Sequence, residues 1–411
     1  MKIEIITIGD ELLIGQVVDT NSAWMAGELN KIGAEVYRVT TVGDNRTDIL
    51  NAIDAAVKQV DVVLLTGGIG PTKDDITKNT LCEYFDTKLI FDQDVYEDLK
   101  LFFTVRGREP DKLSESQAYV PEKCTVIRNP VGTAPITWFE WDGKILVSMP
   151  GVPQEMKWMM TNEILPRLVD HFGRDLFILH KTFLVKGFGE AQLSLFISSW
   201  ENQLPENIRL AYLPSLGFMR LRLSVHGKNR EEAEHLLSVE SEKLRTLLGE
   251  HIFSENDVHP AEIIGERLRK NGKTLGAAES CTGGYVSHLI TLIPGSSDYF
   301  KGSVISYSNE IKQSILKVGE AALKDYGAVS KEVVEEMAKG ALSSLNVDYS
   351  IATSGIAGPG GGTEEKPVGM VWIAAANKDS VIVRKYYFGL NREQNIIRAA
   401  NTTLLMLLEI L

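Results

Sequence analysis

Short apolar runs alternate with amphipathic segments from Met1 to about Gly173. The apolar runs have the length and composition of buried strands: 3–8, 35–42 and 61–65. The segments between them carry apolar residues at helical spacing and follow residues that can cap a helix: 22–31 after Thr20 or Asn21, and 48–60 after Thr47. Strands that alternate with helices predict a mostly parallel sheet with right-handed crossovers. A hairpin is predicted next, because Asp142-Gly143 separates the apolar runs 136–141 and 144–148.

The middle of the chain has a different order of elements. Strand patterns and two helical patterns alternate there in a βαββα order: 181–185, 190–201, 208–213, 218–225 and a long charged helix that ends at Leu248. This order predicts a small α+β module. A polar linker over 254–259 then leads to Pro260, which suits the first turn of a new helix.

The last part of the chain returns to the alternating pattern. Strands are predicted at 274–278, 304–307, 349–352, 369–376 and 381–388, and helices at 285–293, 331–345 and 391–411. A chain of 411 residues is too long for one ordinary core. We therefore expect two three-layer α/β domains with parallel-rich sheets, 1–173 and 255–411, joined by the α+β module at 174–254.

In the first domain, two strands end in turns that bear glycine and carboxylates. Gly9-Asp10-Glu11 follows the first strand, and Thr66-Gly-Gly-Ile-Gly-Pro-Thr-Lys-Asp-Asp75 follows the third. Both turns should emerge at one sheet edge, where carboxylates beside an anion-binding loop suit Mg²⁺-assisted phosphate chemistry. The carboxylates expected at this edge are Asp10, Glu11, Asp74 and Asp75, and the expected phosphate-binding residues are Gly67, Gly68, Gly70, Thr72 and Lys73. The alternative is that Asp10 and Asp75 only cap turns or helices.

In the last domain, two glycine-bearing loops again follow strands. Ser280 and Thr282 stand beside Gly283 and Gly284 at the entrance of a helix, whose free N–H groups favour an anion. The second loop, 353–363, follows another strand and contains Ser354, Gly355 and Gly358. It can form a phosphate cradle or an oxyanion hole. The alternative is an ordinary strand–turn–helix with a flexible loop.

The nucleophile of such a site is not settled by the pattern of residues. Ser280 needs a base, and His288 is too far along the helix to provide it. A lysine kept neutral by burial and neighbouring cations can serve instead, with Tyr307 relaying or orienting the proton. Cys281 is an alternative nucleophile, since a thiol is intrinsically the better one, although a small buried thiol is also a common packing choice. A third reading is that neither residue is a nucleophile.

Composition excludes several classes of protein. The net charge of −12 argues against a general binder of nucleic acid or anionic membranes. The three cysteines, Cys82, Cys124 and Cys281, are too far apart in sequence for a disulfide framework or a zinc-ligand spacing. We see neither a signal peptide nor an apolar segment long enough to cross a bilayer, so the cytoplasm is the expected location.

The first-domain motifs, with Met149-Pro-Gly-Val-Pro153, resemble the molybdopterin-binding domain of molybdenum-cofactor biosynthesis proteins. The version with Gly-Pro-Thr-Lys-Asp-Asp-Ile-Thr is most similar to the CinA (competence/damage-inducible) family. That resemblance implies hydrolysis of ADP-ribose with a divalent cation at Asp10, Asp74 and Asp75. It also implies a KH-type middle module, but Lys186-Gly-Phe-Gly189 lacks the GXXG spacing of a nucleic-acid clamp, which favours a spacer or dimer-forming role.

Three motifs of the last domain resemble the carboxy-terminal CinA domain: Ala278-Glu-Ser-Cys-Thr-Gly-Gly284, Tyr307-Ser-Asn-Glu-Ile-Lys312 and the loop 354–363. The resemblance implies a nicotinamide mononucleotide (NMN) deamidase without a cofactor. It makes Ser280 the nucleophile, Lys312 the base and Tyr307 its helper, with Ser354 assisting. Arg392 would meet the phosphate, but Gly389-Leu-Asn-Arg392 departs from the family's Gly-Asp-Arg, which leaves Arg398 as a rival.

Two other functions remain open. Both clefts would only sense nucleotides if the chain were a non-catalytic scaffold in the competence or damage response. A molybdopterin-handling protein is the third reading, although it leaves the last domain unexplained. The family resemblance also implies a homodimer.

Overall fold

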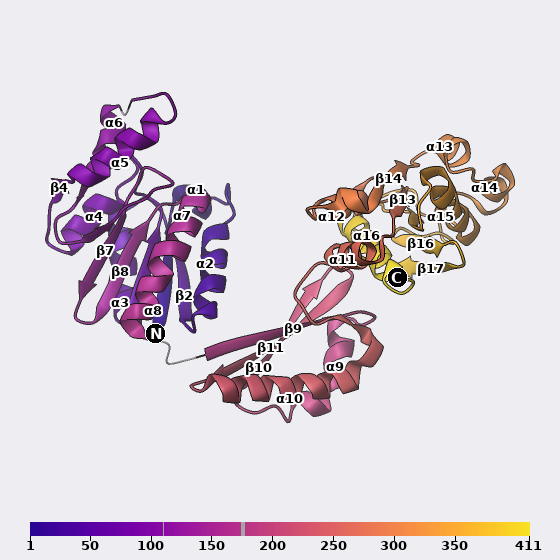
Figure 1. The fold of residues 1–411 in the computed structure, drawn as a ribbon, viewed down its shortest axis with the longest axis horizontal. Helices are drawn as coiled ribbons and strands as arrows, with labels where there is room; N and C mark the ends of the chain where they lie inside the picture. The colour runs from indigo at the N-terminus through magenta and orange to yellow at the C-terminus, as the bar shows by residue number, and fades with distance from the viewer. Residues whose placement is uncertain (110, 174–176) are drawn as a thin grey trace. The chain divides into compact units, whose positions relative to one another are not determined.

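The computed structural model describes residues 1–109, 111–173 and 177–411 (Figure 1). The chain divides into two compact units, which we describe separately. The first comprises 1–179 with 225–236, and the second comprises 180–224 with 237–411.

A six-stranded sheet forms the centre of the first unit. Its order is β2 (Glu35–Val42), β1 (Lys2–Ile8), β3 (Val62–Thr66), β8 (Lys144–Met149), β7 (Ile136–Trp141) and β6 (Thr125–Ile127). The first four strands are parallel to one another. β7 runs antiparallel to both of its neighbours, β8 and β6. The carboxyl ends of β1, β2, β3 and β8 therefore meet at one edge.

Helices cover both faces of this sheet. One face packs against α2 (Thr20–Lys31), α7 (Pro153–Met159), a π-helical turn (Met160–Ile164) and α8 (Leu165–Phe172). The other face packs against α3 (Arg46–Val57) and α4 (Thr77–Tyr84). Side-chain alternation along β1 explains the division, since Ile3 and Ile5 face the first layer and Ile6 and Ile8 face the second.

Smaller elements complete the first unit. They are α1 (Asp10–Leu13), β4 (Leu89–Phe91), α5 (Gln93–Thr104), α6 (Lys112–Glu115), a 3₁₀ turn (Ser116–Ala118) and β5 (Tyr119–Pro121). The helix caps differ from the prediction. Asp19 caps α2 and Asn45 caps α3, because their side-chain oxygens, rather than those of Thr20, Asn21 or Thr47, accept the first backbone N–H groups.

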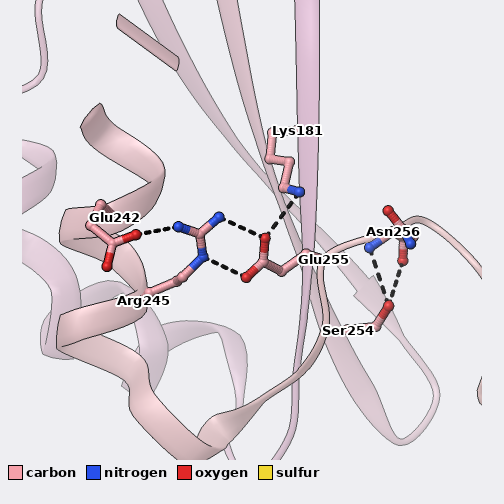
Figure 2. Close-up of polar contacts among 6 residues, drawn as sticks. All are labelled: Lys181, Glu242, Arg245, Ser254, Glu255 and Asn256. Atoms are coloured by element: carbon pink, nitrogen blue, oxygen red, sulfur yellow. Dashed lines mark hydrogen bonds and ion pairs between the residues drawn. The ribbon is translucent and has the colours of Figure 1, made fainter. Parts of the chain in front are cut away.

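The middle module has the predicted order of elements. They are β9 (Phe177–Val185), α9 (Glu190–Glu201), β10 (Ile208–Ser215), β11 (Phe218–Gly227), α10 (Arg230–Leu248), a 3₁₀ turn (Gly249–His251) and β12 (Ile252–Ser254). The sheet order is β10-β11-β9-β12. Figure 2 shows how the chain leaves this module, with the Glu255 carboxylate held between the Arg245 guanidinium and the Lys181 amine. Hydrogen bonds from Arg245 lower the pKa of Glu255 to about 2.

A five-stranded sheet forms the centre of the last domain. Its order is β14 (Phe300–Ile305), β13 (Leu275–Glu279), β15 (Tyr349–Gly355), β16 (Met370–Asn377) and β17 (Val381–Tyr387). The first three strands are parallel to one another, and β16 runs antiparallel to both of its neighbours, β15 and β17. One face packs against α11 (Pro260–Asn271), α12 (Tyr285–Thr291) and α16 (Arg392–Leu407), and the other against α15 (Lys331–Leu345) and its neighbour α14 (Glu320–Tyr326). The remaining elements are a 3₁₀ turn (Ser296–Asp298) and α13 (Asn309–Ser314).

The predicted fold class is confirmed: two three-layer α/β domains with parallel-rich sheets accompany a small KH-like α+β module. One strand boundary matters for the site. The strand predicted at 304–307 is part of a longer strand, β14, which begins at Phe300 and stops at Ile305. Tyr307 therefore lies in the following loop.

Candidate functional site

The two glycine-bearing loops of the last domain meet because their strands are neighbours. β13 and β15 pair in parallel, and the Ser280 N–H donates to the Thr353 carbonyl at 3.1 Å. The hydroxyl oxygens of Thr282 and Thr353 lie 2.7 Å apart in the buried space between the loops. The sheet therefore holds Ser280 at the point where both loops begin.

Lys312 reaches Ser280 from α13. Its Nζ lies 3.1 Å from the Ser280 Oγ and donates to the Ser306 carbonyl at 2.6 Å. The Lys312 residue is only 1% exposed, and burial lowers the pKa of its amine below the ordinary 10.5. Within the described ranges no carboxylate forms an ion pair with Lys312. The amine therefore contacts neutral oxygens, and its protonation equilibrium is shifted toward the uncharged form.

Glu279 was not singled out from the sequence, yet it organises the turn that carries Ser280. Its carboxylate is 1% exposed and accepts from the N–H groups of Gly284, Val286 and Ser287 at 2.9, 3.1 and 2.9 Å. The Ser287 hydroxyl adds a fourth bond at 2.6 Å. These are the amides that begin α12, so the helix entrance is already occupied by an anion of the chain itself. The expectation of an open anion site at this helix was wrong.

The sequence did contain a signal for Glu279. It is the one charged residue of an otherwise apolar strand, and a buried carboxylate needs donors to satisfy it. The turn around it leaves two backbone N–H groups free. Gly283 N–H donates to the Ser280 carbonyl, but no acceptor in the described chain pairs with the backbone N–H of Cys281 or Thr282.

Cys281 is a poor candidate in this environment. Its side chain is buried in the helix-side core, and burial raises the pKa of the thiol to about 12. A thiol with such a pKa carries almost no thiolate at neutral pH. The geometry therefore favours Ser280 over Cys281.

Tyr307 and Arg392 form a pair at the rim. Tyr307 is 64% exposed, and its hydroxyl accepts from Arg392 Nη2 at 3.1 Å. Arg392 Nη1 donates to the Gly358 carbonyl at 2.6 Å, which joins the start of α16 to the second glycine loop. No contact between Tyr307 and Lys312 is present in the described ranges, so the proposed proton relay between them stays a prediction.

The second glycine loop contributes its backbone more than its side chains. The buried Ser354 hydroxyl donates to the Ala328 carbonyl at 2.6 Å, which ties β15 to the segment before α15. Gly355 packs against Val371 so closely that a Cβ would lie 2.6 Å from its side chain. Arg398, the rival of Arg392, donates from Nη1 to the Phe388 carbonyl at 2.8 Å. Of the two arginines, Arg392 is the one bonded to Tyr307 and the glycine loop.

In the first domain, the strand ends also bring two loops together. Gly67 lies directly against the end of β1, since a Cβ there would meet the Ile8 carbonyl at 2.2 Å, and its N–H donates to Met149 O. Asp75 folds the loop that follows: its carboxylate accepts from Gly70 N at 2.7 Å and from Thr72 N and Oγ1 at 2.9 and 2.5 Å. The Asp75 carboxylate therefore shapes the glycine loop through three hydrogen bonds.

Asp10 has a partner that the sequence analysis did not name. Asp10 N donates to Asp44 Oδ2 at 3.1 Å, and Asp44 N donates to Asp10 Oδ1 at 3.2 Å. Burial and the negative charges of Asp10, Glu11 and Asp74 raise the pKa of Asp44. A hydrogen bond from Thr72 lowers the pKa of the exposed Asp74. Asp44 follows the end of a parallel strand, β2, so the strand-end rule that selected Asp10 applies to it as well.

The arrangement of these acidic residues bears on metal binding. Among the described residues, no group of three or more His, Cys, Asp or Glu side chains is arranged to hold a metal ion. A pair of carboxylates is still a fitting partner for Mg²⁺, which commonly takes one or two protein carboxylates and completes its shell with water and substrate phosphate. The mutual repulsion around Asp44 is the kind that a cation relieves.

Within the described ranges, no helix is long and apolar enough to traverse a bilayer. Three family models match successive parts of the chain: "Probable molybdopterin binding domain" at residues 4–170, "Damage-inducible protein CinA KH domain" at 180–254 and "CinA C-terminal domain" at 258–411.

Similar proteins cover nearly the whole chain. A "CinA-like protein" of Flavobacterium psychrophilum is 42% identical over 409 residues, which is 99% of this chain and 98% of the relative. A "Putative competence-damage inducible protein" of Caldicellulosiruptor saccharolyticus is 41% identical over 95% of each chain. Among solved structures, a competence/damage-inducible protein from Agrobacterium tumefaciens is 35% identical and covers 37% of this chain and 93% of its own, with a TM-score of 0.36. The full-length similarity and the three domain matches show that this chain belongs to the CinA family.

Proposed function

We propose that the last domain hydrolyses the carboxamide of NMN to nicotinic acid mononucleotide and ammonia. The observation that carries this proposal is the 3.1 Å contact between the Ser280 hydroxyl and the buried Lys312 amine. A serine hydroxyl becomes a nucleophile only when a base takes its proton, and an uncharged lysine can do so. The residue types and their order also match the deamidase motifs described above.

The reaction can be written in two halves. In the first, Lys312 Nζ accepts the Ser280 proton while Oγ bonds to the carboxamide carbon, and the negative charge on the substrate oxygen is held by the free N–H of Thr282. The C–N bond then breaks, and the proton held by Lys312 leaves with ammonia. In the second half, water gives a proton to Lys312 and attacks the acyl-serine, which releases the acid and restores the hydroxyl.

Arg392 is the residue that we assign to the 5′-phosphate. It is anchored by the Gly358 carbonyl and the Tyr307 hydroxyl, and its remaining N–H groups can approach a phosphate in the bidentate manner typical of arginine. The Glu279 carboxylate supports this assignment, because it occupies the amides of α12 that would otherwise attract the phosphate.

Ammonia release from NMN by the purified full-length chain tests the proposal. Ser280→Ala should abolish release, and Cys281→Ser should retain it, since the thiol is buried and protonated. Both variants remove or replace only one small side chain in the same turn. Release that survives Ser280→Ala, or that is lost in Cys281→Ser while the protein remains folded, would refute the assignment of the nucleophile.

We also propose that the first domain hydrolyses the pyrophosphate of ADP-ribose with a divalent cation such as Mg²⁺. Asp10 and Asp44 would hold the ion, with Asp74 near by, and the loop amides at 67–70 would receive a phosphate. A bound cation would supply charge neutralisation on the phosphate oxygens. Asp75 would act by holding the loop, which differs from the ligand role first expected.

A non-catalytic scaffold is the competing function, and the match to a molybdopterin-binding model keeps a third function in view. Binding of NMN and ADP-ribose without turnover, with metals supplied, would favour the scaffold. Loss of molybdenum cofactor in a deletion strain would favour the third. We further propose a cytoplasmic homodimer, which fractionation and light scattering of the purified chain would test.

A further inference from the structure

A large cavity lies within the second compact unit, away from Ser280. Its volume is about 1160 Å³, and its walls come from the loop after β9, the β10–β11 turn, β17 and α16. Small-molecule sites are typically concave, occupy roughly 300–1,000 Å³ and favour the junctions of domains. This cavity is slightly larger than that range and lies between the KH-like module and the last domain.

Polar contacts hold the walls of the cavity in place. Glu409 of the last domain accepts from Lys186 of the KH-like module at 3.2 Å and from both terminal nitrogens of Arg384 at 2.9 and 2.7 Å. Asn401 donates to the Leu216 carbonyl at 2.6 Å across the same junction. The cavity is therefore preformed, which lowers the cost of ordering it around a ligand.

Aromatic rings line the cavity from both sides. On β17 and just after it, the Tyr386 and Phe388 rings are stacked, with centroids 5.7 Å apart and an angle of 5°. On the KH-like module, the Phe188 and His251 rings lie 4.6 Å apart. Ring faces of this kind accept a planar heteroaromatic group by stacking.

The charges inside favour an anion. Glu409 compensates one of its two cationic partners, Lys186 and Arg384, and Arg398 has no carboxylate partner in the described chain. Among the described residues, the Phe388 carbonyl is the only acceptor for the Arg398 guanidinium, and it engages one N–H. Two carboxylates, Glu190 and Glu250, also line the cavity, but both residues are exposed. An arginine with free N–H groups beside aromatic rings is suited to a phosphate attached to a planar base.

We propose that this cavity binds a small aromatic anion of the mononucleotide class, at a site separate from both candidate active sites. The ring would stack between the Phe188 side and the Tyr386 side, and the phosphate would meet Arg398. The proposal does not depend on NMN or ADP-ribose turnover, because none of the residues that carry it is Ser280, Lys312, Asp10 or Asp44.

Hydrogen exchange of the full-length chain with adenosine 5′-monophosphate as the probe tests the proposal. Peptides that contain 186–190, 214–219 and 384–389 should exchange more slowly with the probe. Protection at the loops around Gly67 or Ser280 would be read separately, since those peptides do not overlap. Adenosine and inorganic phosphate should each protect the cavity peptides more weakly than the nucleotide, because each offers only one of the two contacts.

Matched variants identify the contacts. Arg398→Met and Phe188→Ala should each raise the probe concentration for half-protection roughly tenfold or more, from the loss of a charged hydrogen bond or a stacked ring. Lys385→Met removes a charge from the adjacent position of β17, where the lysine lies over the Trp372 ring, and should have no effect. Unchanged exchange of the cavity peptides at millimolar probe, protection that persists in both variants, or protection by a single-stranded oligonucleotide but not by the mononucleotide would overturn the proposal.

Discussion

The two α/β domains both carry glycine loops at the ends of parallel strands, but the polar side chains at these loops differ in their exposure to water. At the first-domain edge, Asp10 and Asp74 are exposed, and Asp44 and Asp75 are partly withdrawn from water. At the last-domain edge, the Lys312 amine is buried and touches only neutral oxygens. Sheet topology explains where each site lies, and burial explains what each site can do.

This contrast separates two kinds of chemistry. Solvated carboxylates keep their negative charge and attract a cation, which suits phosphate substrates. A buried amine tends to lose its proton, which makes it a base for a hydroxyl. A second buried lysine shows that burial alone is insufficient. Lys78 has a pKa lowered to about 8, but its Nζ lies against Gln117 and the Tyr119 carbonyl, with no hydroxyl to activate.

Removal of metal should produce the largest difference between the domains. Dialysis against a chelator should abolish ADP-ribose hydrolysis and leave ammonia release from NMN unchanged, because only the first site depends on a cation between carboxylates and phosphate. Both activities should be measured on one protein sample before and after adding Mg²⁺ back. Equal sensitivity of both activities would remove the distinction that we draw.

Lys312→Arg should test the base by replacing the lysine with a long side chain that always carries a charge. An arginine stays protonated at any usable pH and cannot accept the Ser280 proton, so kcat for NMN should fall by roughly 10²–10⁴. ADP-ribose hydrolysis in the same sample serves as the control for folding. If the Lys312→Arg protein turned over NMN at the normal rate, the lysine would have only a structural role.

The pH dependence of the two activities should differ in position. The deamidase needs uncharged Lys312, so below the pKa of this lysine its rate should fall about tenfold per pH unit. Asp44 must lose its proton to hold a cation, and its pKa is raised above 3.8. ADP-ribose hydrolysis should still be lost only in the acid range, when Asp44 becomes protonated. Lowering the pH from neutral should therefore reduce ammonia release before ADP-ribose hydrolysis, as parallel pH profiles would reveal.

The same lysine affects stability with a definite sign. Its folded pKa lies below the unfolded 10.5, so the unfolded chain binds more protons between these two values. The free energy of unfolding contributed by Lys312 should therefore rise with pH through that window. The measurement is the denaturant midpoint of the parent and of a Lys312 variant at several pH values. A difference that falls as the pH rises would contradict the assigned direction of the pKa shift.

Glu279→Gln should have the smallest effect of the four changes. The amide keeps one acceptor oxygen but turns its NH₂ group toward backbone donors, which should cost about 1–3 kcal/mol of stability and displace the Ser280 turn. The expected signs are a lower Tm and a lower kcat with KM little changed. Glu310→Gln, at an exposed position of α13, is the matched control. A kcat equal to that of the parent would show that the turn keeps its shape without the carboxylate.

Much of this architecture was accessible from the sequence. Hydrophobic periodicity placed most of the predicted strands within about two residues, but β14 and β9 start several residues earlier and β15 ends later than predicted. The short strands β4, β5, β6 and β12 were not predicted. Strand ends and glycine loops then led to Ser280, and the family motifs to Lys312. These signals are local in sequence, and parallel pairing of β13 with β14 and β15 brings them together.

Contacts that depend on side-chain direction were less accessible. Asp74 and Asp75 could not be distinguished from the sequence, but the structure turns Asp75 back to the loop amides. Asp19 and Asn45 cap helices because their oxygens reach the first amides, and spacing alone did not distinguish them from neighbouring cap residues. Glu279 and Asp44 were missed for a similar reason, since their partners are backbone groups that any residue could supply.

The packing of Gly43 against Asp10 makes the position of one charge adjustable. A methyl group built at Gly43 would lie 2.4 Å from Asp10 Oδ1, and a carboxylate at the end of a short side chain can swing aside at little cost. Alanine at this position would therefore relocate the charge while preserving it, which replacing Asp10 cannot do. Metal affinity measured in such a variant would report how strictly the ion requires its ligand in one place.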